Sequence, residues 1–136
     1  MPDRAVFYLR TARAAPRAGG ESPSIIGQRR ICQQAATALG AEVVGEFVDD
    51  AVSGSTLDRP GLAACLARLD AAPRVDYVVV SDLIRLGRDV PVAAQVARRA
   101  TERGVRLHLA TELRNYVADN GILDLVGSFA QRRPSP

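Results

Sequence analysis

The sequence predicts an α/β domain: a mainly parallel sheet of about four strands with helices on both faces. The main observation is that short apolar or β-branched runs alternate along the chain with segments whose apolar residues recur every three or four positions. Strands that alternate with helices form right-handed βαβ units, which makes consecutive strands parallel. The 136 residues and the 47% hydrophobic content are enough for one domain with a core of its own.

The first strand is expected at residues 5–9, an apolar run. Proline and paired glycines then predict a flexible loop at 13–20. An amphipathic helix follows, with Ser24 as its expected N-cap and Gly40 as its stop signal. Residues 41–47 are predicted to form the second strand.

A polar loop is expected at 48–58, and Pro60 then starts a second helix over 61–69, because proline is tolerated in a first helical turn. The β-branched run at 75–81 is the expected central strand, since strands buried on both faces are apolar throughout. A third helix at 91–103 and a fourth strand at 105–110 complete the alternation. A last apolar stripe at helical spacing comprises Ile122, Leu125, Val126 and Phe129.

Composition excludes several classes of protein. Neither a signal peptide nor a run of the roughly 20 apolar residues of a membrane span is present, which favours the cytoplasm and no membrane partner. Cys32 and Cys65 are expected to be buried free thiols, and the one histidine, His108, is expected to pack within a strand. No metal or other cofactor is therefore predicted.

All eighteen basic residues are arginines, and the net charge is +3. Arginine binds phosphate with a planar fork that lysine lacks, although arginine-rich, alanine-rich sequences also arise from GC-rich genomes. The positions of the arginines are therefore more informative than their number. Arg10, the 49–59 segment and the pair Arg85 and Arg88 each follow a predicted strand. Because ligand sites of parallel sheets lie beyond the carboxyl ends of the strands, these three segments are expected to converge on one anionic group.

Together these motifs resemble the catalytic domain of the serine site-specific recombinases, the resolvase/invertase family. The resemblance spans residues 1–131, with 132–136 as a disordered tail. It implies a resolvase-like fold and DNA phosphodiester transfer through a phosphoserine, without metal or ATP. The positions that match the family's site motifs are Arg10, Gln28, Asp49, Ser53, Arg59, Arg85 and Arg88.

Two positions depart from the family pattern. Ala12 stands where the resemblance places the nucleophilic serine, and Ile84 stands where it places an aspartate before the first arginine. Loss of a nucleophile costs about a millionfold in rate, so the chain is predicted to be cleavage-deficient. Thr11 is the alternative hydroxyl, but neighbouring residues of an extended segment point to opposite faces.

The resemblance places the opening of the family's dimer helix at residue 121, and this helix is expected to be truncated, with no DNA-binding domain after it. The resemblance therefore implies weak, non-specific contact with the DNA phosphate backbone. It also implies a homodimer, or a heterodimer with an intact recombinase, through the stripe at 122–129. Two alternatives stay open: an active strand-transfer enzyme that uses Thr11, and a non-enzymatic dimerisation or phosphate-binding regulatory module.

Overall fold

The computed structural model describes residues 2–12, 21–50, 59–86 and 90–116. These residues form a five-stranded sheet in the order β2-β1-β3-β4-β5. Strand β1 (Asp3–Arg10) pairs in parallel with β2 (Ala41–Asp49) and with β3 (Tyr77–Val80). Strand β3 pairs in parallel with β4 (Arg106–Leu109), so the predicted parallel α/β sheet is confirmed.

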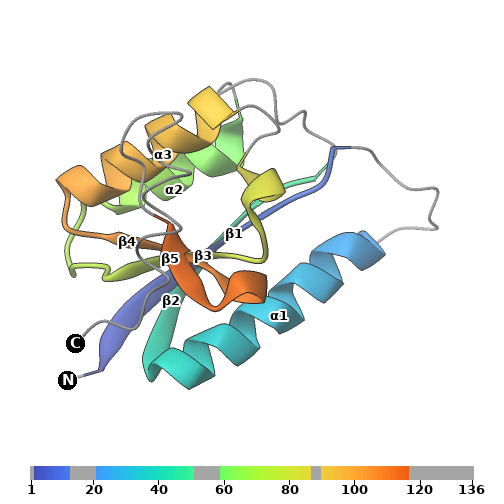
Figure 1. Ribbon diagram of the computed structural model, residues 1–136, viewed down its shortest axis with the longest axis horizontal. Helices are drawn as coiled ribbons and strands as arrows, with labels where there is room; N and C mark the ends of the chain where they lie inside the picture. The colour runs from blue at the N-terminus through green and yellow to red at the C-terminus, as the bar shows by residue number, and fades with distance from the viewer. Residues whose placement is uncertain (1, 13–20, 51–58, 87–89, 117–136) are drawn as a thin grey trace.

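Helices cover both faces of this sheet (Figure 1). Helix α1 (Pro23–Leu39) lies on one face, and α2 (Pro60–Arg68) and α3 (Val90–Glu102) lie together on the other. Alternate residues of the central strands supply the two cores: Val78 packs on the α2 and α3 side, and Val79 packs on the α1 side. The buried, β-branched composition of β3 follows from this double coverage.

The start of α1 differs from the prediction. Ser22, not Ser24, is the N-cap, and its hydroxyl accepts from the backbone N–H groups of Ser24 at 3.1 Å and Ile25 at 3.4 Å. Pro23 occupies the first helical position, where its fixed φ fits and its missing N–H costs nothing. At the other end the prediction is correct: Gly40 ends the helix with a left-handed φ of 68°.

The fifth strand was not predicted. After β4, the short helix η2 (Ala110–Glu112) and Leu113, at a φ of 54°, reverse the chain. Strand β5 (Arg114–Tyr116) then pairs antiparallel with β4 at the edge of the sheet. Its three residues are mostly polar, so neither length nor alternation marks them as a strand.

The predicted places of the cysteines and of the histidine are confirmed. Cys32 and Cys65 are buried free thiols, and burial raises the pKa of each to about 12. His108 is buried against the ring of Tyr77, with its Nδ1 2.8 Å from Oδ1 of Asn115. Within the described part of the chain, no helix is long and apolar enough to cross a membrane.

Candidate functional site

At the carboxyl edge of the sheet, two arginines from distant segments each donate a hydrogen bond to the main-chain carbonyl of the other. Arg10 is the last residue of β1, and Arg85 lies in η1 (Leu83–Arg85), the short helix that follows β3. Nε of Arg10 donates to the carbonyl of Arg85 at 2.8 Å, and Nη2 donates to the carbonyl of Ile84 at 2.7 Å. Nη1 of Arg85 donates back to the carbonyl of Arg10 at 3.2 Å. The ends of β1 and β3 are thereby joined.

A third arginine completes this group, which we call the arginine cluster: Arg10, Arg59 and Arg85. Arg59 stands at the N-cap of α2 and is fully buried. Its Nη1 donates to the carbonyl of Arg85 at 3.3 Å, and its Nη2 donates to the carbonyl of Leu86. Its guanidinium also lies 5.7 Å from the centre of the Tyr8 ring, within the range of a cation–π contact.

Gln28 is one helical turn into α1 and fixes the backbone of Arg10. Its Oε1 accepts from the Arg10 N–H at 3.1 Å, and its Nε2 donates to the Arg10 carbonyl at 3.0 Å. The same Nε2 lies 3.0 Å from the hydroxyl of Ser24. The predicted site glutamine therefore acts on the cluster through the main chain of Arg10.

Asp49 is buried at the end of β2 and caps α2 from a distance. Its Oδ1 accepts from the N–H of Gly61 at 2.7 Å, and its Oδ2 accepts from the N–H of Leu62 at 2.9 Å and from the hydroxyl of Tyr8 at 2.8 Å. A carboxylate at a helix N-terminus satisfies orphan donors and complements the helix dipole. Burial, followed by the hydrogen bond to Asp49, raises the pKa of Tyr8 far above its ordinary value.

The remaining predicted positions lie apart from these contacts or outside the described residues. Ala12 is exposed two residues after Arg10. Ile84 turns its side chain outward, 57% exposed, while its carbonyl accepts from Arg10. Ser53, Arg88 and the stripe at 122–129 lie outside the described residues, as does the tail at 132–136.

Sequence reasoning missed Asp82, whose Oδ1 lies 3.4 Å from Nε of Arg85. The signal available was the three-residue spacing, which brings two side chains together within one helical turn. It also missed Asp50, whose Oδ1 accepts from the hydroxyl of Thr11 at 2.6 Å. Thr11 itself is only 5% exposed.

The arginine cluster brings three guanidinium groups close to a few buried polar atoms that lack hydrogen bonds. Asp82 lies within ion-pair distance of the cluster, with its Oδ1 3.4 Å from Nε of Arg85. Three buried polar atoms here have no hydrogen-bond partner: Nε of Arg59, Nε of Arg85 and Oδ1 of Asp82. Unsatisfied buried donors in a positively charged cluster are suited to an anion with several acceptor oxygens.

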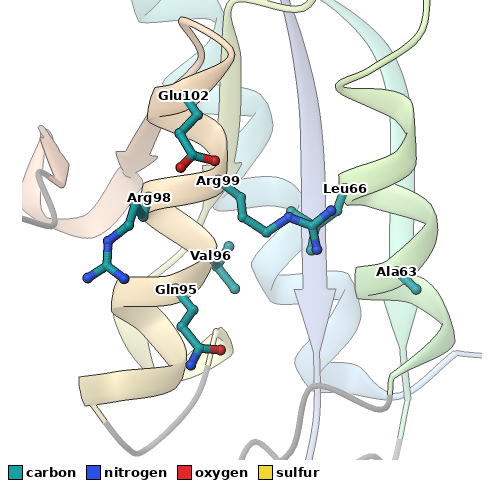
Figure 2. A pocket seen from close by; sticks show the side chains of 7 residues that line it. All are labelled: Ala63, Leu66, Gln95, Val96, Arg98, Arg99 and Glu102. Carbon is teal, nitrogen blue, oxygen red and sulfur yellow. The ribbon is translucent and has the colours of Figure 1, made fainter.

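A cavity of about 340 Å³ lies elsewhere, between α2 and α3 (Figure 2). Leu66 and Val96 supply apolar walls, and Arg99 extends from α3 toward α2. None of its lining residues belongs to the arginine cluster, so we do not place the site there. Among the described residues, no group of three or more histidines, cysteines or carboxylates is placed to hold a metal.

Comparisons with known proteins agree with this fold. A protein-family model described as "Resolvase, N terminal domain" matches residues 5–133. A search of curated proteins returned no match.

Solved structures show the same fold. The N-terminal catalytic domain of TP901-1 integrase is 21% identical with a TM-score of 0.75, and the match covers 95% of this chain and 97% of that one. A resolvase family site-specific recombinase from Streptococcus pneumoniae is 18% identical with a TM-score of 0.71, over 95% of this chain and 86% of that one. The C-terminal catalytic domain of ISC1926 TnpA, an IS607-like serine recombinase, is 22% identical with a TM-score of 0.65, and the match covers 94% of this chain and 79% of that one.

Proposed function

This chain belongs to the resolvase N-terminal domain family, and on that premise we propose that it is a recombinase catalytic domain that holds a DNA phosphate without cutting it. The arginine cluster would supply the positive charge that a phosphodiester needs. The single observation that carries the proposal is that three guanidinium groups gather after the strand ends, while position 12 holds a methyl group.

Phosphodiester transfer by a protein nucleophile needs an attacking oxygen as well as positive charge around the phosphorus. Ala12 has no such oxygen, and Ile84 has no carboxylate. Asp82 lies beside Arg85 and supplies a carboxylate near the one that is missing at position 84. No residue that the structure describes supplies the missing nucleophile at position 12 in the same way. Binding without cleavage is the function that this combination supports.

The binding half of the proposal is tested with a fluorescent DNA duplex in an anisotropy titration. We expect weak, sequence-independent binding that falls steeply as salt rises, because phosphate contacts release counterions. Arg85→Ala should weaken binding, and Arg30→Ala is the matched control, since Arg30 is an exposed arginine on α1. Equal losses in both variants would show that the binding is general surface attraction.

The cleavage half is tested by trapping a covalent protein–DNA adduct on supercoiled DNA. The unmodified chain should give none. Ala12→Ser combined with Ile84→Asp should restore adduct formation on DNA that carries a suitable site. An adduct from the unmodified chain would overturn the proposal that cleavage has been lost.

The hydrogen bond between Thr11 and Asp50 favours a second candidate function, active strand transfer through Thr11. A carboxylate 2.6 Å from a hydroxyl can accept its proton, as a general base must. The burial of Thr11 weighs against access to a phosphate. In this case the unmodified chain would form an adduct, and Thr11→Val would abolish it.

Pairing with a second chain is part of the same proposal. A cleavage-deficient subunit that dimerises with an intact recombinase would dampen it, as a regulatory module does. The residues predicted for that contact, Ile122, Leu125, Val126 and Phe129, support it by their helical apolar spacing.

A further inference from the structure

The carbonyls of one short turn accept hydrogen bonds from Arg10 and Arg59, two of the three arginines of the cluster. Arg10 donates to the carbonyls of Ile84 and Arg85, and Arg59 donates to those of Arg85 and Leu86. All three accepting groups are main-chain atoms of consecutive residues. A phosphate oxygen that approached these guanidinium groups would compete with them for the same N–H donors.

The turn is anchored in the core on either side, by Leu83 and Leu86, and exposed at Ile84 between them. Leu86 is fully buried in the core under α2 and α3, whereas Ile84 is 57% exposed and lies outside both core clusters. The hydrogen bonds within the turn are two, from the N–H of Arg85 to Asp82 at 3.2 Å and from the N–H of Leu86 to Leu83 at 3.0 Å. The peptide groups of Ile84 and Arg85 can rotate while Leu83 and Leu86 stay in place, provided that their hydrogen bonds from Arg10 are replaced.

The closed arrangement leaves part of the cluster unsatisfied. Nε of Arg59 and Nε of Arg85 are buried without a hydrogen-bond partner, and Asp82 stands 3.4 Å from the latter. The carbonyls that accept from Arg10 and Arg59 are neutral, whereas a phosphate would offer charged acceptors to the same donors. An anion that replaced one or two carbonyls would supply hydrogen-bond acceptors and negative charge together.

We propose that the turn at residues 84–86 is a gate: its carbonyls close the arginine cluster, and a phosphate opens it by taking their place on Arg10 and Arg59. This inference rests on the proposed function and concerns the regulation of the same site. It makes phosphate affinity depend on how easily the turn leaves its closed form, because opening is part of binding.

A matched pair of variants at position 84 isolates the cost of opening. Ile84→Ala removes the exposed side chain, and Ile84→Gly removes it and also loosens the backbone. Glycine disfavours helical turns relative to alanine, so only Ile84→Gly destabilises the closed form. We expect Ile84→Gly to bind inorganic phosphate up to about fivefold more tightly than Ile84→Ala at constant ionic strength.

Amide NMR spectra of the whole chain during the same phosphate titration provide the second measurement. The amides of Arg85 and Leu86 should shift and lose protection from exchange as phosphate binds, while those of Val78 and Val79 in β3 stay unchanged. These spectra also show that both variants remain folded.

Equal phosphate affinities of the two variants, with shifts confined to the arginine side chains, would overturn the gate and leave the anion site standing. If no variant binds phosphate and the unmodified chain does not either, the proposed anion site fails, and the gate fails with it.

Discussion

The hydroxyl of Tyr8 donates a hydrogen bond to Oδ2 of Asp49 at 2.8 Å, and this contact joins β1 to the carboxylate that caps α2. Both residues are buried. Tyr8 also places its ring near the guanidinium of Arg59. One side chain thus connects the cap of a helix with the arginine cluster.

Tyr8→Phe should lower the free energy of unfolding by about 1–2 kcal/mol, because Asp49 loses one of its three donors in a buried site. Urea denaturation measures this. Tyr77→Phe is the control, since the Tyr77 hydroxyl contacts the exposed Arg106, and its cost should stay within about 0.5 kcal/mol. Equal costs would show that the buried hydrogen bond carries no special weight.

Gly61→Ala should destabilise the protein by about 1–3 kcal/mol. A Cβ atom at Gly61 would lie 2.6 Å from the carbonyl oxygen of Val48 and 2.9 Å from Cγ of Asp49, so the start of α2 must move away from β2. Gly27→Ala is the matched control, because nothing lies within 4 Å of its Cβ position in α1. It should stabilise the protein by about 0.5–1 kcal/mol. A stable Gly61→Ala variant would show that the close approach is not needed.

Ser22→Ala should cost about 1 kcal/mol, since it removes the N-cap of α1. Ser24→Ala should cost less than half as much, because the Ser24 hydroxyl accepts from the side chain of Gln28 and caps no backbone N–H of the described helix. Thermal and urea unfolding of the two variants distinguish the positions. A larger stability cost for Ser24→Ala than for Ser22→Ala would show that Ser24 caps the helix.

Stability should fall as pH rises from about 9 to 12. Burial raises the pKa of Cys32 and Cys65 to about 12, whereas thiols of the unfolded chain have a pKa of about 8.5. Between these values the unfolded state loses protons that the folded state keeps, so each thiol lowers stability by at most about 1.4 kcal/mol per pH unit. Denaturation in reductant across this range measures the slope. Cys32→Ala and Cys65→Ala should each flatten it, and an unchanged slope in both would contradict the assignment.

Phe129→Asp should weaken any dimer of this chain, because a carboxylate in an apolar contact loses hydration without gaining a partner. Light scattering over a range of protein concentrations gives the mass. Gln131→Asp is the control, since it adds the same charge outside the apolar stripe. A chain that is monomeric with and without the substitution would remove pairing through this stripe.

The sequence was sufficient to predict the parallel sheet, because the pattern of β3 and of the helix faces is local. It also predicted that Arg10 and Arg85 follow strands, whereas Arg59 stands at the N-cap of α2, ten residues after β2 ends. The main-chain carbonyls of residues 10 and 84–86, to which these arginines donate, could not be predicted as partners, because a carbonyl has no signature in the sequence.

Two errors have a similar cause. Ser22 and Ser24 are both capping residue types, and only the position of Pro23 decides that the helix begins after Ser22. Strand β5 is too short and polar to show alternation, and it forms because η2 and Leu113 bring it beside β4.

The antiparallel direction of β5 decides where the polypeptide leaves the sheet. Tyr116 lies opposite Leu107, which is level with Val78 and Val6, whereas Arg10 comes four residues later along β1. That difference is about 13 Å along the strands, and β1 and β5 are three strand spacings, or about 14 Å, apart sideways. The last residue of β5 therefore lies roughly one strand length behind Arg10 along the strand direction, so a ligand held by Arg10 is beyond the reach of the β5 end.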